Sequence, residues 1–246
     1  INNKSIHAKT TTHVIETLLS GTEKKYAVTV EHQIEVPIGM GFGTSAGGAL
    51  TTGLALKEAL SLPLTYNQIG QVAHASEILC QTGLGTVSSL NFGGGLILVT
   101  KPGAPGICQT DRIPISPDYL IVVGFYPVHI PKKPLFSSPK QKQEINRYGK
   151  RALESILDEP SLETFLDQCW QFAQKAGFAN EKICQLVKTA KKAGAVGAAQ
   201  NMIGEAVHAV VKEENANSVA EAFKQTLSPQ QVLISRIDFQ GARLIK

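Results

Sequence analysis

The stretch PIGMGFGTSAGG, from Pro37 to Gly48, is the most informative part of the chain. It contains five glycines and the hydroxyl pair Thr44-Ser45, and an apolar segment with helical spacing follows it. Glycines allow the backbone to approach a ligand closely, and the free N–H groups at a helix start carry partial positive charge. The stretch therefore predicts an anion site, and a phosphate group suits such a site.

Two common phosphate-binding motifs fit this stretch poorly. A P-loop requires Gly-Lys-Ser/Thr, but no lysine occurs between Pro37 and Leu56. The dinucleotide fingerprint Gly-x-Gly-x-x-Ala is matched literally, from Gly41 to Ala46, but the acid expected after the next strand has no counterpart. Glu58 comes too early and lies within the predicted helix. A tight structural turn remains as an interpretation without any ligand.

A third phosphate motif fits almost position by position. PIGMGFGTSAGGAL resembles the Pro-x-x-x-Gly-Leu/Phe-Gly-Ser/Thr-Ser-Ala/Gly loop of the GHMP kinases, which are named for galactose, homoserine, mevalonate and phosphomevalonate. Further along, the order AHASEILCQTGLGTV, GGLILVTKPGAPG, INRYGKRAL and GAAQNMIGEAVHAV is similar to the archaeal pantoate kinases, a divergent branch of that superfamily.

The resemblance implies both a fold and an activity. The expected fold class is α+β: an N-terminal ATP-binding domain with a left-handed βαβ crossover over residues 1–116, and a ferredoxin-like C-terminal domain over 117–246. The implied reaction is phosphorylation of the 4-hydroxyl of pantoate with ATP and Mg²⁺, by an enzyme that forms a homodimer. The chain begins at Ile1, inside what would be a family member, so we expect the first strands of the family to be absent.

The resemblance assigns nucleotide binding to the loop and a metal ligand to the helix that follows. The residues implied to bind the nucleotide are Gly39, Gly41, Gly43, Thr44, Ser45, Ala46 and Gly47. Ser45 would face the phosphates and the metal, although it could also cap the helix, and the two roles are compatible. Glu77 resembles the Mg²⁺ ligand, and hard cations prefer carboxylate oxygens.

Glu77 and the substrate residues also have simpler interpretations. Glu77 lies beside the apolar stripe of its helix, so we expect a half-buried carboxylate, and a salt bridge on the helix flank is the alternative to a metal site. His74 shares a helix face with Glu77 and is implied to lie near pantoate, but it could be structural. Arg147, Lys150 and Arg151 start a helix, and any one of them could bind the substrate carboxylate or simply be solvated. Arg147 is the residue assigned, because a guanidinium binds a carboxylate with two prongs.

Two positions and one further segment bear on the other motifs of the family. Thr86 stands where family members commonly have an aspartate, so a catalytic carboxylate is missing there. Leu98 lies in the strand where many family members have an arginine. An anchor for the substrate carboxylate is therefore absent or is supplied by Arg147 or Lys101. The segment Gly194–Gly204 corresponds to a third, glycine-rich motif that packs against the first. Phosphoryl transfer without an aspartate base remains feasible, because positioning and charge neutralisation lower its barrier.

Hydrophobic periodicity predicts the other elements. We expect a half-buried strand over Tyr26–Val36, then helices containing Ala46–Leu54 and Ile69–Cys80, and a buried strand in GGGLILVT. A second unit should begin near Pro117 with the core strand YLIVVGFYPV. Helical stripes follow at Ile145–Leu157 and Leu162–Ala173, the latter capped by Ser161, then a helix over Glu181–Lys192 and a strand, helix and strand to the end.

Composition excludes several other classes of protein. With 246 residues, 43% hydrophobic and 18% charged, the chain can bury a core and is not disordered. No apolar run is long enough to span a bilayer, and the four separated cysteines fit reduced thiols in a cytoplasmic protein. A basic cluster lies between Lys132 and Arg151, but the net charge of +4 and the lack of interleaved aromatics argue against nucleic acid. Two alternatives stay open: a related GHMP kinase that acts on another small alcohol, such as homoserine or mevalonate, and a catalytically silent metabolite-binding protein of this fold.

Overall fold

The computed structural model describes residues 1–83, 85–128 and 138–245. The chain forms two compact units, each discontinuous in sequence: the first comprises Ile1–Val36, Gly43–Arg112 and Asp238–Lys246, and the second comprises Pro37–Phe42 and Ile113–Ile237. Lys132 and Lys133 of the basic cluster lie outside the described residues. The domain division at 116/117 stays a prediction.

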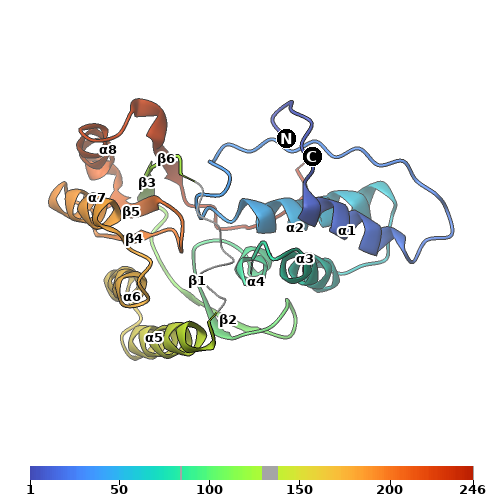
Figure 1. The fold of residues 1–246 in the computed structure, drawn as a ribbon, viewed down its shortest axis with the longest axis horizontal. Helices are drawn as coiled ribbons and strands as arrows, with labels where there is room; N and C mark the ends of the chain where they lie inside the picture. The colour runs from blue at the N-terminus through green and yellow to red at the C-terminus, as the bar shows by residue number, and fades with distance from the viewer. Residues whose placement is uncertain (84, 129–137, 246) are drawn as a thin grey trace. The chain divides into compact units, whose positions relative to one another are not determined.

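The first unit is mostly helical (Figure 1). Its elements are α1 (Lys9–Leu19), α2 (Thr44–Ala59), α3 (Tyr66–Cys80), α4 (Thr86–Phe92), β1 (Leu96–Lys101) and β2 (Gln109–Ile113). The helices α1, α2 and α3 pack against one another around a core of small and aliphatic side chains. A Cβ on Gly53 would lie 2.6 Å from Ile69 Cγ2, so α2 and α3 approach closely only because residue 53 is glycine.

The predicted helices of this unit are confirmed. The stripe from Ala46 to Leu54 is buried along α2, as expected of a helix inside a core. A reciprocal capping box fixes the start of α3: Thr65 accepts from the Gln68 backbone N–H, and Gln68 accepts from the Thr65 backbone N–H. Buried residues follow along α3 at helical spacing, from Ile69 to Cys80.

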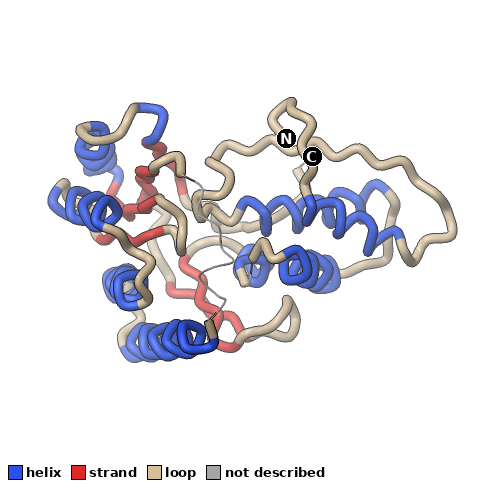
Figure 2. Tube along the Cα trace, viewed as in Figure 1, coloured by secondary structure: helices blue, strands red, loops and turns tan. Residues whose placement is uncertain are grey.

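The predicted strand over Tyr26–Val36 is wrong in one respect. Burial alternates as expected, with Val28, Val30, His32 and Ile34 half-buried and the residues between them exposed. No strand pairs with this segment among the described residues, however, and Figure 2 shows it as a loop. Its hydrogen bonds to distant residues involve Asn2 and Thr11 instead. Asn2 donates to the His32 and Ile34 carbonyls and accepts from the Ile34 N–H, and the Thr11 hydroxyl lies 3.2 Å from the His32 ring nitrogen Nε2. The side-chain period is therefore that of a strand, but a strand also needs a ladder partner.

The strand predicted in GGGLILVT is present but less buried than expected. It is β1, which pairs with β2 in a two-stranded sheet, and of its residues Leu98 alone is buried. A two-stranded sheet covers few side chains, so most of β1 stays half-buried.

The second unit is a four-stranded sheet with helices. Its elements are β3 (Tyr119–Phe125), α5 (Pro139–Asp158), α6 (Leu162–Lys175), α7 (Glu181–Lys192), β4 (Gly197–Gln200), β5 (Ala206–Lys212), α8 (Ala216–Lys224) and β6 (Val232–Arg236), with short 3₁₀ turns η2 (Glu213–Asn215) and η3 (Pro229–Gln231). The strand order is β4-β5-β3-β6, and all three pairings are antiparallel. The helices α7 and α8 contribute to the main core with β3 and β5.

The predictions for this unit are largely confirmed. The helix α7 has the predicted bounds, and the Ser161 hydroxyl accepts from the Thr164 backbone N–H as the N-cap of α6. The stripe on α5 is weaker than expected: only Ile156 is buried, and Leu157 is exposed. All four cysteines are free. Within the described ranges, no helix combines the length and apolar character needed to cross a bilayer.

Candidate functional site

The helix α2 begins with backbone donors that have no partner among the residues described. Gly43 is its N-cap, in the left-handed conformation with φ of 68°, and supplies no side-chain cap. The first hydrogen bond of the helix runs from the Gly47 N–H to the Gly43 carbonyl. In the part of the chain that the structure describes, no acceptor faces the N–H groups of Thr44, Ser45 or Ala46. Such amides are able to donate to an anion, which is what the predicted phosphate site requires; the binding role itself stays a prediction.

The Ser45 hydroxyl is held by Glu77. Ser45 Oγ donates to Glu77 Oε1 at 2.6 Å, and it also lies 3.4 Å from the Thr82 carbonyl oxygen. Ser45 is therefore not the N-cap, because Gly43 occupies that position two residues earlier. A hydrogen bond of this length to an ionised carboxylate belongs to the strong class.

The Glu77 carboxylate is fully buried rather than half-buried. The residue is 2% exposed, on the inner face of α3. A salt bridge on the helix flank is wrong, since no lysine, arginine or histidine of the described residues is ion-paired with it. Burying a carboxylate without a cation costs free energy unless it is hydrogen-bonded or binds a metal.

The chain after α3 passes directly over this carboxylate. A Cβ on Gly83 would overlap Glu77 Oε2 and would lie 2.8 Å from Glu77 Oε1. Only glycine leaves room for the carboxylate there. Thr82 joins the same corner to α1, through a 2.9 Å hydrogen bond between its hydroxyl and that of Thr10.

Ser45 and Glu77 fit a divalent ion that shares its ligands with a phosphate. Magnesium in proteins is commonly held by one or two carboxylates, with waters and substrate phosphates completing the octahedron. No group of three or more His, Cys, Asp or Glu side chains suits a metal among the residues described. One buried carboxylate beside a hydroxyl and unpartnered amides therefore matches a nucleotide-bound metal better than a cage made of protein ligands.

The first half of the glycine loop belongs to the second unit. Gly39 and Gly41 both have φ of 84°, and Met40 between them is buried in a small core with β3 and β5. Phe42 adds an edge-to-face contact with Phe125, at 6.4 Å between ring centroids. The nucleotide-binding role of Gly39 and Gly41 remains a prediction, and their backbone conformation is the one that a phosphate loop uses.

The third motif packs against this half of the loop, as expected. A Cβ on Gly41 would overlap the Asn201 carbonyl oxygen, and a Cβ on Gly204 would lie 2.7 Å from the Gly41 nitrogen. Both glycines are therefore needed for the close approach. The turn that joins β4 to β5 is held by a 2.7 Å contact between Asn201 Oδ1 and His208 Nδ1. Burial lowers the pKa of His208 to about 4, so its neutral ring donates to Asn201 at neutral pH.

The two predicted substrate residues lie in different units. His74 is partly buried on α3, three residues before Glu77 and thus on the neighbouring face. Arg147 is exposed on α5, where its guanidinium lies 4.9 Å from the centre of the Tyr148 ring and donates to the Tyr148 hydroxyl. The structure gives each a place within its own unit only.

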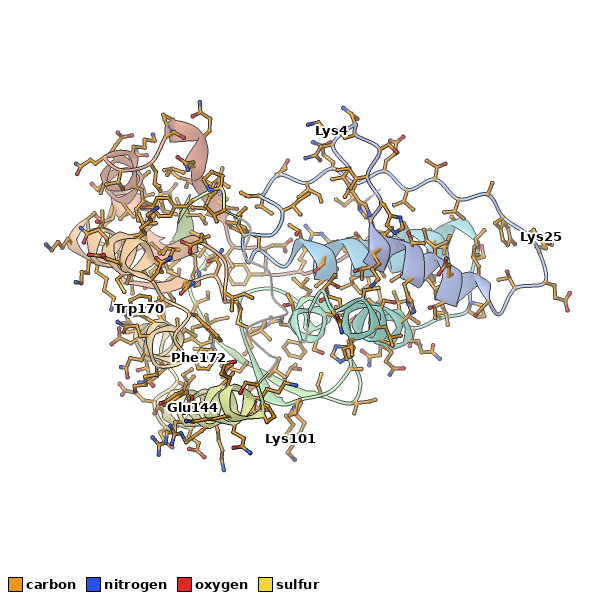
Figure 3. All side chains as sticks on the ribbon, viewed as in Figure 1. Lys4, Lys25, Lys101, Glu144, Trp170 and Phe172 are labelled. Carbon is orange, nitrogen blue, oxygen red and sulfur yellow. The ribbon has the colours of Figure 1, made fainter. Side chains whose placement is uncertain are left out.

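The departures from the family pattern differ in their surroundings. A Cβ on Gly43 would lie 2.9 Å from the Thr86 methyl carbon, so position 86 adjoins the start of α2. A threonine there cannot serve as a carboxylate base. Leu98 is 5% exposed and so sits in the interior, whereas Lys101 is exposed at the end of β1 (Figure 3).

Sequence reasoning missed Gly83 and Asn201 as residues that shape the site. Gly83 belongs to the quoted QTGLGT segment, where a glycine directly after a helix end is an ordinary cap signal and does not indicate that it covers a carboxylate. Asn201 lies in the third motif, but its contact with Gly41 joins residues 160 positions apart (201 − 41) and leaves no local pattern.

Comparison with known proteins points to one family. Residues 8–94 match the family described as GHMP kinases N terminal domain. The pantoate kinase of Methanocaldococcus jannaschii is 30% identical over 230 residues, which cover 92% of this chain and 80% of that protein. The pantoate kinase of Thermococcus kodakarensis is 33% identical over 201 residues, which cover 82% of this chain and 64% of that relative.

A solved structure supports the same grouping. The protein described as a phosphotransferase related to CoA biosynthesis pathway superposes with a TM-score of 0.75 at 28% identity. The superposition covers 98% of this chain and 78% of that one.

Proposed function

The chain belongs to the GHMP kinase family and has its α+β fold. We propose that it is a pantoate kinase. It would transfer the γ-phosphoryl group of ATP to the 4-hydroxyl of pantoate. The observation that supports this most directly is the buried Glu77 carboxylate, 2.6 Å from the Ser45 hydroxyl beside the free amides of α2. That arrangement provides both a phosphate site and a cation ligand.

The proposed binding roles follow from this geometry. The N–H groups of Thr44, Ser45 and Ala46 donate to phosphate oxygens, and the partial positive charge at the start of α2 favours the same anion. Gly39, Gly41, Gly43 and Gly47 allow the backbone to lie against the nucleotide. Ser45 and Glu77 hold Mg²⁺, which when bound would neutralise charge on the phosphates.

The chain's own residues supply positioning rather than a strong base. With Thr86 in place of an aspartate, the proton of the attacking hydroxyl passes to water or to the γ-phosphate. Phosphoryl transfer needs little covalent help from the protein, since orientation and charge stabilisation lower most of its barrier. His74 is the proposed contact of the substrate in the first unit, and Arg147 is the proposed partner of its carboxylate.

A direct assay tests the proposed substrate. The protein is incubated with Mg-ATP and, separately, pantoate, homoserine or mevalonate, and ADP release is followed. Turnover with pantoate alone is the expected result. Turnover with another alcohol would replace the substrate, and nucleotide binding without turnover would indicate a silent member of the family.

A different small alcohol is the second candidate, and Leu98 favours it. Leu98 is buried where family members often have an arginine, so the substrate carboxylate loses one anchor in the first unit. An acceptor with a weaker need for a cation would tolerate this change.

The finer fold assignment and the assembly belong to the same proposal. We expect the left-handed crossover in the N-terminal domain and the ferredoxin-like arrangement in the C-terminal domain. The antiparallel order β4-β5-β3-β6 with its helices supports the second of these expectations. A homodimer is the proposed assembly, and light scattering measures it directly.

A further inference from the structure

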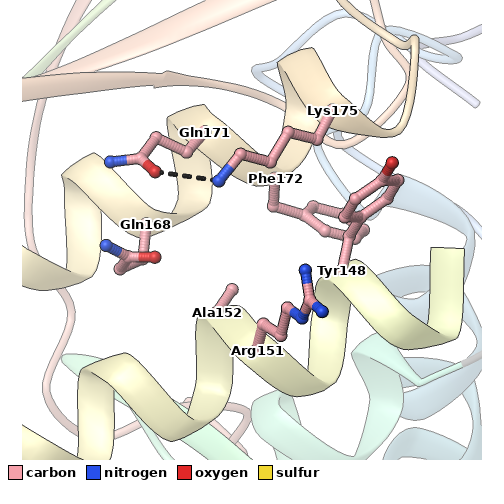
Figure 4. Close-up of a pocket in the computed structure, with 7 residues that line it drawn as sticks. All are labelled: Tyr148, Arg151, Ala152, Gln168, Gln171, Phe172 and Lys175. Atoms are coloured by element: carbon pink, nitrogen blue, oxygen red, sulfur yellow. Dashed lines mark hydrogen bonds between the residues drawn. The ribbon is translucent and has the colours of Figure 1, made fainter. Parts of the chain in front are cut away.

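A pocket apart from the candidate site lies entirely within the second unit, between α5 and α6 (Figure 4). Its volume is about 230 Å³, and it is lined by Tyr148, Arg151, Ala152, Gln168, Gln171, Phe172 and Lys175. None of these residues belongs to the glycine loop, the third motif or the Glu77 corner. The pocket therefore needs an explanation of its own.

The pocket has two charged lining residues, Arg151 and Lys175, and both are positively charged. Figure 4 shows the Arg151 guanidinium, from α5, directed toward the space between the helices, and the Lys175 side chain, from α6, lying along its own helix with the ammonium group at Gln171. No carboxylate is among the lining residues. Lys175 donates to Gln171 Oε1 at 3.2 Å, and Arg151 has no hydrogen bond or ion pair with any residue that the structure describes.

Two other basic side chains close to these helices in sequence are ion-paired. Lys150 contacts Glu154 at 3.7 Å, and Lys191 contacts Asp167 at 2.6 Å. Glu154 and Asp167 are thus paired with lysines that do not line the pocket. Two cations that face one space without an acid repel each other, and an anion between them removes that repulsion.

The remaining lining provides an amide pair and a flat apolar wall. Because the Gln171 side-chain oxygen accepts from Lys175, its amide N–H groups are free to donate to a ligand, and Gln168 offers a second amide. Tyr148 and Phe172 both line the pocket, and Phe172 is held by an edge-to-face contact with Phe178 at 5.8 Å between ring centroids. A ring wall of this kind suits a planar group.

We propose that the pocket between α5 and α6 is a binding site for a small organic anion, with its phosphate or carboxylate on Arg151 and Lys175 and a flat apolar part against Tyr148 and Phe172. The volume lies below the usual 300 to 1,000 Å³ of drug-sized ligand pockets, so the ligand is about as large as one ring with one anionic group. The proposal does not depend on the kinase activity.

The test uses the full chain and two probes, phenyl phosphate and inorganic phosphate, in titration calorimetry. Arg151→Gln and Lys175→Gln remove one cation each, and Lys150→Gln removes a cation from the same helix outside the pocket. Wild type should bind phenyl phosphate saturably and more tightly than inorganic phosphate. Each pocket variant should lose about tenfold in affinity, as expected for one charged hydrogen bond, while Lys150→Gln should match wild type.

Three results would overturn the proposal. They are the absence of saturable binding, the same loss in all three variants, or equal affinity for the two probes. Because the substituted side chains are exposed, the variants should fold normally, and circular dichroism checks this. The glycine loop is unchanged in every variant, so phosphate bound at α2 would appear as binding that no substitution alters.

Discussion

Ser45 and Glu77 form a pair in which each side chain fixes the other. The serine hydroxyl has its strongest acceptor in a carboxylate that is buried and has no cation among the described residues. Removing the hydroxyl leaves the phosphate without one oriented group and the carboxylate without its donor. Ser45→Ala should therefore lower turnover by roughly 10²- to 10³-fold, as for loss of one donor to a charged transition state.

The control for Ser45→Ala is Thr51→Ala on the same helix. Thr51 is exposed, and its hydroxyl donates within α2 to the carbonyls of Gly47 and Gly48. Steady-state rates of ADP formation measure both variants. Unchanged turnover in Ser45→Ala would remove this residue from the mechanism.

Gly83 gives a second prediction that acts through Glu77. A methyl group at position 83 would overlap the carboxylate, which must then move. Misplacing a catalytic group by about 1 Å can cost on the order of 10²-fold in rate, so Gly83→Ala should lose activity on that scale while the protein stays folded. Gly21→Ala, with open space around the new methyl group, is the matched control. Equal rates in the two variants would show that the contact is unimportant.

His208 predicts a pH dependence of stability. Its pKa in the folded state is about 4, against 6.5 when exposed, because burial disfavours the charged ring. A histidine of lowered pKa contributes stability above pH 6.5, and this contribution is lost as the pH falls towards 4. Between pH 7 and pH 5 the linked loss in unfolding free energy is about 2 kcal/mol.

Urea unfolding of wild type and His208→Gln at these two pH values measures the effect. Wild type should lose more stability than the variant on acidification, by about the same 2 kcal/mol. The glutamine can still donate to Asn201 and does not titrate. Parallel losses in both proteins would contradict a neutral buried ring.

At the scale of elements, the segment Pro37–Phe42 of the glycine loop packs against the β4–β5 turn within the second unit. Gly41 and Gly204 allow contacts that no larger residue permits, and Gly41 also has positive φ. Gly41→Ala and Gly204→Ala should each lower the unfolding free energy by about 2 kcal/mol or more. Gly149→Ala in α5 is the control: its new methyl group meets only Phe172, at 3.6 Å, and alanine favours the helix. A small loss of unfolding free energy in all three variants would mean that the β4–β5 turn accommodates the added methyl groups by shifting.

Elements with a local signal could be predicted from the sequence. The bounds of α7, the Ser161 cap of α6 and the stripe of α2 follow from periodicity and capping residues within one segment. The segment Tyr26–Val36 shows the limit. Its alternation is real, but strand pairing depends on a partner elsewhere in the chain, and alternation alone does not supply one.

At the scale of the whole molecule, neither unit is continuous in sequence. The loop residues Pro37–Phe42 belong to the second unit, and Asp238–Lys246 returns to the first. There the Gly95 N–H donates to the Asp238 carbonyl, and Gly241 packs closely against Gly93. The assignment of these two segments depends on contacts between residues far apart in the sequence. A division of the sequence into two consecutive parts does not predict it.

The candidate site shows the same division between local and distant information. The loop pattern, Ser45 and Glu77 could be singled out from sequence, because glycines before a helix and a carboxylate beside an apolar stripe are local features. The full burial of Glu77 and its cover by Gly83 could not, since they depend on how α2 and α3 pack.

The central claim is that Glu77 holds the divalent ion of a nucleotide bound at the start of α2. Titration calorimetry with a non-hydrolysable ATP analogue, with and without Mg²⁺, tests it in wild type and in Glu77→Gln, which keeps an acceptor for Ser45. Mg²⁺ should tighten binding to wild type by about tenfold or more and should have little effect on the variant. The same tightening in both proteins would contradict the account.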